Sequence, residues 1–362
     1  MDEDNSSIPE THKLGIRASS PPAPVPHDEP PFSVRSETGS QTTINGLPET
    51  DLTNVGNTRP PQHCLPFSGD SIEKIYMTYF VTGDMHSYWH GRKVRLEGGS
   101  THFAQLNLMC NLFSTCPRPI ILPAMTPHGE YSLRMTFDLD RSFAFLIGKA
   151  QSLDTRILQN DESFYSAISG FTDAEGHVGL KKSSGAGYAN FALSNRKFEI
   201  MSDFQLGLLL RGYKAGLYPL RRNGKTQWSL GVFGNSAVRL LTNLHLRHKE
   251  KLRATAIALE YNGKPWKVGG EIYKVHRQDI RIERIRLEKV AEQRYRLRGE
   301  RRKEKMKIWK SKIEASFPLV ARGLSMEVLA EKLGCSLRTA YRRKEKYRET
   351  QGLEQVGGTL SL

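Results

Sequence analysis

The sequence predicts an α+β protein in which one unit of a helix and hairpins occurs twice, followed by an all-helical C-terminal region. Three observations support this prediction. Apolar residues recur at three- and four-residue steps over residues 164–176, as they do along one face of a helix. Strand-like runs separated by turn residues follow this helix. An earlier stretch, 72–86, aligns with 163–177 without gaps, which indicates a second copy of the unit.

The predicted helix at 164–176 combines a bare face with an acidic end. Gly170 and Ala174 lie four residues apart, so they share one face, and another backbone can approach it closely. Asp173 and Glu175 fall at the end of the helix, where Gly176 is placed to stop it. Carbonyl groups at a helix C-terminus repel negative charge, so the acids are unfavourable there on their own. A divalent cation would resolve this conflict.

The stretch 168–177 resembles the LAGLIDADG motif of homing endonucleases. The family's small residues, sixth-place acid, metal-binding acid and final glycine are matched in turn by Gly170 and Ala174, Asp173, Glu175 and Gly176. The resemblance implies two pseudo-symmetric αββαββα halves that form a saddle of antiparallel sheets. It also implies that two such helices pack face to face and that their last acids hold metal ions over DNA. The structural alternative is an amphipathic helix that happens to end in acids.

The first copy is degenerate. It places Asp84 at the position of Glu175, but it departs from the motif at three other positions, which are Tyr79, Thr82 and Met85. The Tyr79 ring stands where a small residue is expected and would hold the two helices apart unless it swings aside. A pseudo-symmetric monomer and a homodimer built on the second copy both remain open.

The remaining elements follow the order that the resemblance requires. For the first copy we expect a strand or hairpin at 86–96, a helix at 101–114 capped by Ser100 or Thr101, a hairpin at 120–124 and 131–137 with its turn at His128-Gly129, and a short helix at 141–149. For the second copy we expect a hairpin at 177–182 and 188–194, a helix at 198–212, a hairpin at 215–221 and 226–233, and helices at 236–244 and 246–261. The two copies occupy 71–160 and 161–265.

The net charge of +15 and the pI of about 9.6 favour a polyanionic partner. A curved antiparallel sheet fits the major groove of double-stranded DNA, where each base pair shows a distinct pattern of donors and acceptors. We expect Lys182 to share a strand face with Asn190. A solvated strand residue is an equal alternative for each candidate taken alone. The candidate DNA contacts on the strands are Arg92, Lys93, Arg95, Lys181, Lys182, Arg221, Arg222, Lys225 and Gln227.

The C-terminal region is basic and helical. Residues 281–312 hold fourteen Lys or Arg against five Glu, and we interpret 266–315 as a basic helical linker that either tracks phosphates or is a solvated connector. Residues 316–350 have the pattern of a helix-turn-helix, with caps at Ser325 and Ser336. Its small core is expected to contain Leu333, Leu337 and Tyr341. The second helix would offer three basic residues to a DNA groove, namely Arg338, Arg342 and Arg343.

Other parts of the chain carry less chemistry. Residues 1–70 are rich in Pro, Ser, Thr and acids, and we expect them to be disordered. We interpret residues 351–362 as a short tail. The four cysteines form no C-x-x-C pair and complete no zinc site, so we interpret them as thiols of an intracellular protein of cytoplasm, nucleoid or organelle matrix. No apolar run is long enough to span a membrane.

The resemblance implies a site-specific DNA endonuclease that breaks both strands of a long asymmetric target. Asp84 and Glu175 would bind Mg2+, and Lys251 would steady the hydrolytic water. Asp173 would support the helix end without binding metal. Two alternatives remain open on the same fold: a DNA-binding transcriptional regulator that has lost cleavage, and an intron maturase whose partner is intron RNA.

Overall fold

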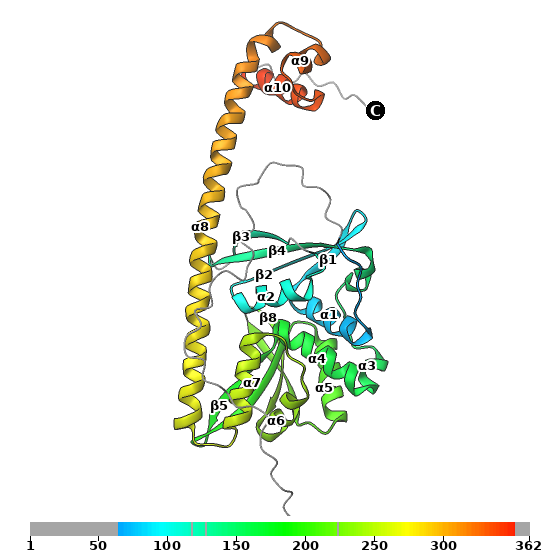
Figure 1. Cartoon of the computed structure of the whole chain (residues 1–362), viewed down its shortest axis with the longest axis vertical. Helices are drawn as coiled ribbons and strands as arrows, with labels where there is room; N and C mark the ends of the chain where they lie inside the picture. Colours follow the sequence, from blue (N-terminus) through cyan, green and yellow to red (C-terminus); the bar gives the residue numbers. More distant parts are fainter. Residues whose placement is uncertain (1–63, 117–118, 127–128, 223, 352–362) are drawn as a thin grey trace, which may run out of the picture. The chain divides into compact units, whose positions relative to one another are not determined.

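The computed structural model describes residues 64–116, 119–126, 129–222 and 224–351 (Figure 1). The predicted disorder of 1–70 therefore falls mostly outside the described residues, as does the tail beyond residue 351 and His128 of one predicted turn. All four cysteines are described and are free thiols. None of the described helices is long and apolar enough to cross a membrane.

The first half of the protein, Ser71–Leu146, runs helix, hairpin, helix, hairpin. Its elements are α1 (Ser71–Asp84), β1 (His86–His90), β2 (Lys93–Ser100), α2 (Phe103–Leu112), β3 (Ile120–Met125), β4 (Tyr131–Leu139) and the 3-10 helix η2 (Arg141–Leu146). Helix α2 begins later than expected, and its N-cap is His102, which makes no side-chain capping bond. Ser100 instead accepts a hydrogen bond from the backbone N–H of His102, so the predicted cap is wrong.

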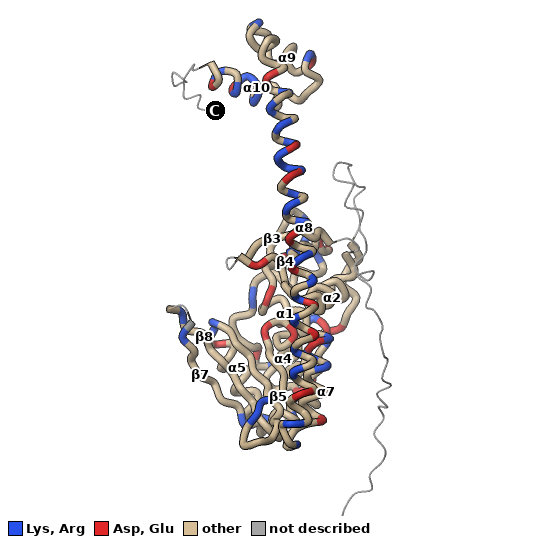
Figure 2. The backbone as a smooth tube through the Cα atoms, turned by 90° about the vertical axis from the view of Figure 1, so that its left-hand side faces the viewer, with Lys and Arg blue, Asp and Glu red and all other residues tan. Residues whose placement is uncertain are grey.

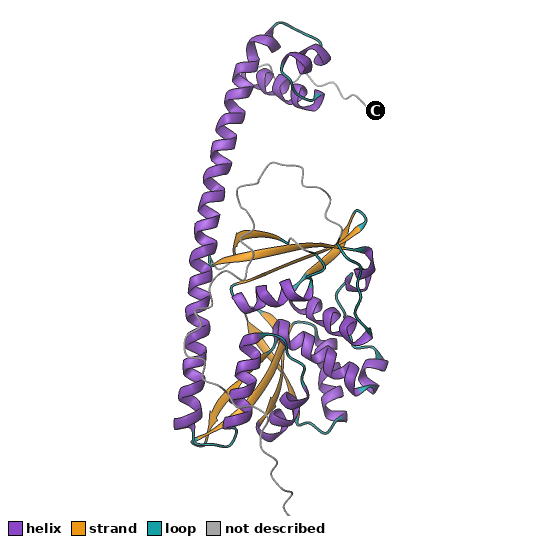
Figure 3. Cartoon of the chain, viewed as in Figure 1, coloured by secondary structure: helices purple, strands orange, loops and turns teal. Residues whose placement is uncertain are grey.

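The second half, Thr155–Tyr261, repeats this order and then adds two helices. Its elements are α3 (Thr155–Gln159), α4 (Asp161–Glu175), β5 (His177–Ser183), β6 (Ala186–Asn195), α5 (Phe198–Leu210), β7 (Ala215–Arg222), β8 (Lys225–Phe233), α6 (Gly234–Asn243) and α7 (Lys249–Tyr261). Within the described residues the strands form two antiparallel four-stranded sheets, ordered β1-β2-β4-β3 and β5-β6-β8-β7 (Figure 3). The two orders are equivalent, which confirms the predicted duplication of an α+β unit.

Helices α1 and α4 pack against each other through residues without side chains. A Cβ atom added at Gly170 of α4 would collide with the backbone carbonyl oxygen of Tyr76 on α1. Near the other end of the contact, a Cβ added at Gly83 would lie 2.5 Å from the Cβ of Ala174. Because these positions carry no side chain, the two helix backbones approach closely and end side by side.

Tyr79 does not hold the helices apart. Its ring leaves α1 for the core of the second half, where it lies 5.9 Å from the ring of Phe204 in an edge-to-face contact. Its hydroxyl donates to the backbone carbonyl of Ser152 at 3.3 Å. This bulky residue of the first copy therefore serves as a link between the halves.

Each half has its own hydrophobic core, made by the inward faces of its sheet and helices. Fully buried aromatic side chains mark both cores, with Phe80, Phe113 and Phe137 in the first and Phe171, Phe191 and Phe204 in the second. Along β4 the apolar residues 133, 135, 137 and 139 face this core, and the residues between them are polar, which is the expected pattern of a strand with one apolar face.

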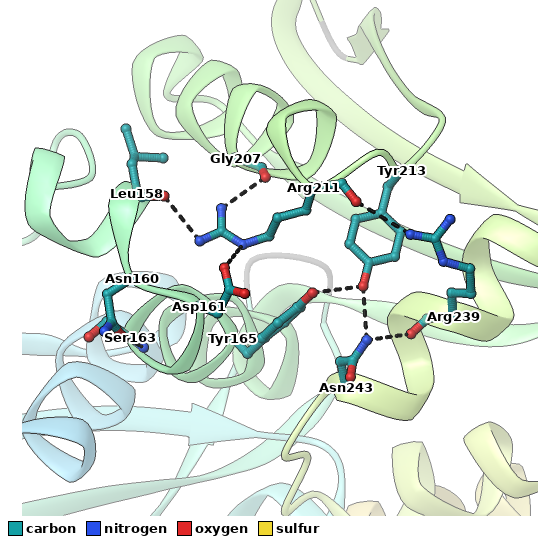
Figure 4. A network of polar contacts seen from close by, with 10 residues as sticks. All are labelled: Leu158, Asn160, Asp161, Ser163, Tyr165, Gly207, Arg211, Tyr213, Arg239 and Asn243. Atoms are coloured by element: carbon teal, nitrogen blue, oxygen red, sulfur yellow. Dashed lines mark hydrogen bonds and ion pairs between the residues drawn. The ribbon is translucent and has the colours of Figure 1, made fainter.

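A polar network holds the start of α4 (Figure 4). The buried guanidinium group of Arg211 makes an ion pair with Asp161 at 2.9 Å and donates to the backbone carbonyl of Leu158 at 3.0 Å. The hydroxyl groups of Tyr165 and Tyr213 lie 2.8 Å apart, within hydrogen-bonding distance. These bonds join α3, α4 and α5, so they also fix where the other end of α4 lies.

The C-terminal region begins with one long helix, α8 (Trp266–Ala321), followed by α9 (Met326–Lys332) and α10 (Leu337–Thr350). The backbone N–H of Gly187 donates to Lys264 O, and that of Trp266 donates to Gly185 O, which ties the start of α8 to the β5–β6 turn. Leu287 and Ala291 are fully buried against the first half. The predicted linker, 266–315, and the first residues of the predicted helix-turn-helix segment, 316–321, therefore form one continuous helix.

The helix-turn-helix has the predicted caps but a different core. Ser325 and Ser336 cap α9 and α10 as expected, accepting hydrogen bonds from Val328 N and Thr339 N. Leu337 and Tyr341 are 48% and 62% exposed, so their predicted burial is wrong. The small core instead contains Val320, Met326, Leu329, Ala330 and Ala340, with Leu333 packed at its edge. The opposite face of α10, which carries Ala340, is the one that turns inward.

Candidate active site and DNA-binding surfaces

Asp84 and Glu175 are the last residues of the two paired helices, and both line one cavity of about 400 Å³. Lys251 of α7 lines the same cavity. The structure therefore brings together the three residues that the sequence analysis proposed for catalysis. They come from three separate elements, and the close packing of α1 on α4 places the two carboxyl groups near each other.

The two acids are held in an environment that opposes their ionisation. Burial and the nearby charge of Asp84 together raise the pKa of Glu175 to about 7. Burial also raises the pKa of Asp84, against the opposing effect of Lys251 and Lys149. Two carboxyl groups with raised pKa values in one cavity are a typical arrangement for a functional site, because packing alone would not select them.

Lys251 resolves the electrostatic conflict at the end of α4. Its ammonium group donates hydrogen bonds to the carbonyl oxygens of Thr172 at 2.6 Å and Asp173 at 2.8 Å. Burial lowers the pKa of Lys251 to about 8, although the surrounding carboxylates oppose this shift. The sequence led us to expect a cation at this helix end, and the Lys251 ammonium group is one such cation. The Glu175 carboxylate still lies on the cavity wall.

Lys149 makes the equivalent contact in the first copy, at the end of α1. The sequence analysis did not identify this residue. Its ammonium group donates to the backbone carbonyl of Gly83 at 3.3 Å, in the last turn of α1. The end of each central helix therefore receives a lysine from a segment that follows the last hairpin of its own half. That position within the repeat is the signal that could have identified Lys149.

Two amide side chains orient the carboxylates. Gln105 Nε2 donates to Asp84 Oδ2 at 3.1 Å, and Asn195 Nδ2 donates to Glu175 Oε1 at 3.4 Å. Each amide lies at nearly the same sequence separation from its acid, 21 residues in one copy and 20 in the other. The sequence analysis missed both amides, although this near-repeat could have indicated them.

Asp173 lies in the last turn of α4 and is not among the residues that line the cavity. It is fully buried, and its Oδ2 accepts hydrogen bonds from the Tyr76 hydroxyl and from the backbone N–H of Arg247 at 2.6 Å. The Arg247 guanidinium lies 4.0 Å from the centre of the Tyr76 ring and pairs with Glu73 of α1. This cluster clamps α1, α4 and the segment before α7 together behind the two acids.

The residues present fit a hard divalent cation. In the part of the chain that the structure describes, no group of three or more His, Cys, Asp or Glu side chains is placed to hold a metal ion. A cation here would have Asp84 and Glu175 as carboxylate ligands, because Glu250, which lines the same cavity, is paired with His102; water and phosphate oxygens would complete its shell. Mg2+ typically binds in this way, because it gives up its waters reluctantly.

Comparisons with known proteins gave one family-model match and several similarities to solved structures. A model of a homeodomain-like domain, HTH_23, matches residues 317–357. The homing endonuclease I-WcaI bound to its DNA recognition sequence has a TM-score of 0.38 at 12% identity, covering 51% of this chain and 88% of its own. DUF199/WhiA from Thermatoga maritima has a TM-score of 0.36 at 14% identity, covering 81% and 95%. I-DmoI in complex with DNA and Mn has a TM-score of 0.33 at 14% identity, covering 49% and 98%.

The structure has the predicted duplicated α+β fold followed by a C-terminal helical region, and the homeodomain-like model matches that region. No curated protein matches this sequence. The similarities to solved structures concern the fold, and each of those chains is mostly covered by this one. The equivalent strand orders and the paired central helices establish the duplicated α+β fold.

On the sheet of the first half, the candidate DNA contacts differ in whether another side chain already binds them. Arg92 lies in the exposed turn between β1 and β2, and Lys93 is exposed at the start of β2. Arg95 shares the face of Lys93, but both of its guanidinium bonds go to Asp138, at 2.6 and 2.8 Å. Arg92 and Lys93 therefore remain open to an incoming phosphate, whereas Arg95 would first have to leave its partner.

On the sheet of the second half, the strand register separates the candidate DNA contacts into two faces. Lys181 pairs with Tyr188 and so shares a face with Asn190, and its ammonium lies 5.3 Å from the centre of the Phe233 ring. Lys182 pairs with Gly187 and points to the other face, so its predicted grouping with Asn190 is wrong. The strand alternation was read correctly, but the pairing across the hairpin set the opposite parity.

The β7–β8 hairpin shows the same separation. Arg221 pairs with Thr226, and Arg222 pairs with Lys225, so these two pairs lie on opposite faces. Gln227 shares the face of Lys225. The side chain of Arg222 lies outside the described residues. The candidate contact face of this sheet thus carries Lys181, Asn190, Lys225 and Gln227, and Arg221 belongs to the other.

In the helix-turn-helix, two of the three predicted basic contacts are exposed. Arg338 and Arg342 lie four residues apart on the solvent side of α10. Arg343 is half-buried, and its Nε has no hydrogen-bond partner among the described residues. We therefore keep Arg338 and Arg342 as the candidates for a groove contact and treat Arg343 as a residue that packs beside the small core.

Proposed function

We propose that this chain is a site-specific DNA endonuclease that hydrolyses one phosphodiester bond in each strand with the help of Mg2+. The observation that carries the proposal is the cavity at the ends of α1 and α4. It joins two carboxyl groups of raised pKa, one from each half, to a buried lysine whose pKa is lowered to about 8. One acid from each half corresponds to one cut in each strand.

In this proposal Asp84 and Glu175 hold the metal ion. When bound, Mg2+ supplies an activated water and neutralises charge on the leaving oxygen. The amides of Gln105 and Asn195 keep the two carboxylates in their orientation, because each donates one hydrogen bond to the acid of its own half. The carboxylates then need little reorganisation when the metal and the DNA phosphate arrive.

The two lysines would share a second task. Lys251 and Lys149 hold the last carbonyl groups of α4 and α1, so their positive charges lie beside the acids and near the place of a scissile phosphate. A lysine with a pKa of about 8 carries its proton at neutral pH and can donate a hydrogen bond to the hydrolytic water. We propose that Lys251 steadies the water for one strand and Lys149 for the other.

The DNA itself would lie across the candidate contact faces of both sheets. The cations there hold phosphates and set the register, and the polar strand residues read base edges in the major groove. The chain's net charge of +15 agrees with such a partner. This part of the proposal concerns DNA binding and is independent of cleavage.

The experiment is a selection followed by a cleavage assay. The full chain selects duplexes from a random library in Ca2+, and the recovered duplex is then incubated with Mg2+. We expect cuts in both strands with the full chain and none with Glu175→Gln on the same duplex. Tight binding with intact DNA across several divalent cations would overturn the endonuclease proposal.

That outcome would favour a second candidate, a DNA-binding regulator without cleavage. Two features favour it. The homeodomain-like region is a DNA-reading unit in its own right. In the first copy, Thr82 replaces the supporting acid, and its hydroxyl donates within α1 to the carbonyl of Thr78. An intron RNA that competes with the selected duplex for the same sites would instead support a maturase.

A further inference from the structure

Helix α8 contains a long stretch that is open to solvent along its whole length. Every residue of 295–312 is exposed. Ala291 is fully buried against the first half, and Ile313 is the next buried residue, just before the helix-turn-helix core. We call residues 295–312 the arm. It joins the body of the protein to the helix-turn-helix as a single uninterrupted helix.

The arm has a strongly uneven charge. It holds nine Lys or Arg and two Glu, and basic residues recur along this part of α8 (Figure 2). At about 100° per residue, Glu300 and Glu304 fall beside each other on one side of the helix, and the nine cations occupy the remaining roughly two thirds of its circumference. The arm also exposes five large apolar side chains, but its excess of positive charge suits it to lie beside a polyanion.

The helix is held at both ends and supported along its surface. Arg296 pairs with Glu292 at 2.6 Å, and Lys310 lies 4.0 Å from Glu314, each at the favourable four-residue spacing. Buried contacts anchor the residues on either side of the arm. We therefore treat the arm as a rod of defined length, in contrast to a flexible tether.

The length of this rod matches the repeat of DNA. From Ala291 to Ile313 the helix rises by about 33 Å, at roughly 1.5 Å per residue. One turn of B-form DNA is about 34 Å, which is the spacing at which two reading units meet the same side of the duplex. The two anchored ends of the arm are thus separated by about the length of one turn of DNA.

The arm leaves the body at the first half. The ring of Tyr295 lies 5.6 Å from that of Tyr131 at the start of β4, and Arg284 pairs with Glu130 beside it. Within the residues that the structure describes, the helix-turn-helix occurs once, at the far end of this arm. The helix-turn-helix can therefore extend the DNA contacts at one end of the target only.

We propose that the helix-turn-helix reads a second block of duplex DNA about one helical turn beyond the contacts of the first half, with the arm following the phosphates between the two blocks. The target is then a bipartite site, with an outer block on the flank bound by the first half and none on the other flank. This inference rests on the DNA binding of the proposed function, but it does not require cleavage.

The experiment selects duplexes from a library with a long randomised centre, using three full-length proteins in Ca2+. They are the unaltered chain, the variant Arg338→Ala with Arg342→Ala, and a variant with twelve Gly and Ser residues inserted after Gly299. For the unaltered chain we expect a central block and one outer block at a fixed spacing. The double variant should keep the central block and lose the outer one, with affinity about 10- to 100-fold lower.

The variant with the Gly and Ser insertion tests whether the arm fixes the distance between the two blocks. We expect it to select the same two blocks at variable spacing, because a Gly and Ser linker does not fix their distance. On a duplex with five extra base pairs between the blocks, the unaltered chain should fall to the affinity of the double variant, and the inserted variant should lose less.

Three results would overturn the inference. One is a central block without an outer block, one is outer blocks on both flanks, and one is a variable spacing for the unaltered chain. Each leaves the proposed function intact, since the central block is still bound. No enrichment of any duplex would overturn the DNA binding of the proposed function as well.

Discussion

Gly170 of α4 lies directly against the backbone carbonyl of Tyr76 on α1, closer than any side chain at position 170 would allow. This contact sets the spacing between the two central helices. It therefore also sets the spacing between the two acids at their ends.

The first prediction is that Gly170→Ala destabilises the protein. The added methyl group meets a backbone atom that cannot rotate away, so the helices must separate, at a cost of about 1–3 kcal/mol. Gly299→Ala is the matched control, because Gly299 has open space around it in a helix, and alanine there should stabilise by about 0.5–1 kcal/mol. Thermal unfolding of both variants measures this. Equal shifts in Tm would show that α1 and α4 do not approach as described.

The second prediction is that Glu175→Gln abolishes cleavage and leaves DNA affinity nearly unchanged. Glutamine keeps the shape and the contact with Asn195 but cannot balance a divalent cation. Glu162→Gln is the control, since Glu162 lies exposed in the first turn of the same helix and should retain full cutting. Gel assays of strand cleavage and binding decide the matter. Substantial residual cutting by Glu175→Gln would place the metal site elsewhere.

The third prediction is that each half of the protein cleaves one DNA strand. If Asp84 serves one strand, Asp84→Asn should stop double-strand cleavage and leave at most a nick in the other strand. Supercoiled plasmid carrying the target distinguishes nicked from linear product. Full linearisation by Asp84→Asn, together with a dimer in light scattering, would favour the homodimer built on the second copy.

The fourth prediction is a pH dependence of stability. The pKa of Glu175 is about 7 in the folded protein against 4.5 for the free group, so its contribution to stability is present below pH 4.5 and is lost as the pH rises through 7. At pH 8 without metal, Glu175→Gln should be more stable than the unaltered chain by on the order of 1–3 kcal/mol.

Denaturant titrations of both proteins from pH 4 to pH 8 test this prediction. The two proteins are compared at each pH because Lys251 titrates in both, so the difference between them reports on Glu175. The advantage of the variant should vanish near pH 4. Mg2+ at pH 8 should stabilise the unaltered chain more than the variant, because a ligand stabilises only the form that binds it. A constant difference between the two proteins at every pH would mean that Glu175 is not held in a desolvated site.

The fifth prediction concerns the salt dependence of DNA binding. Arg338→Ala with Arg342→Ala should lower the log–log salt slope by roughly 0.9 for each phosphate that the variant no longer neutralises. Cleavage positions should stay unchanged, because they depend on the two central helices. A control that removes the same charge outside α10, Arg322→Ala with Lys332→Ala, should change the slope less. Identical slopes for both variants would mean that the exposed face of α10 makes no DNA contact.

The sequence predicted those features that depend on local pattern. The alternation of elements, the paired acids and the two capping serines follow from spacing and residue type, and the structure has them. Features that depend on contacts between distant segments were missed. The ring of Tyr79 enters the other half's core, and Lys149 reaches back to α1 from beyond η2.

Two errors have specific physical causes. Lys182 was assigned to the wrong face because the tight turn between β5 and β6 sets which residues pair, and a shift of one residue exchanges the two faces. Tyr341 was placed in the helix-turn-helix core because it is large and apolar. The small residue Ala340 lies there instead, because α10 packs closely against its neighbours.

The hydrogen bond between Tyr76 and Asp173 makes the two halves of the protein unequal. In the gap-free alignment of the two copies, Tyr76 corresponds to Ala167 and Asp173 to Thr82. The bond therefore occurs once, because the equivalent pair of residues, Ala167 and Thr82, cannot form it. A protein assembled from two second halves would bury two Asp173 carboxylates without their tyrosines, at a cost of about 1–3 kcal/mol or more for each. The two helices of the central pair are therefore not interchangeable at this contact, and a copy of α4 in place of α1 would lose the tyrosine that Asp173 binds.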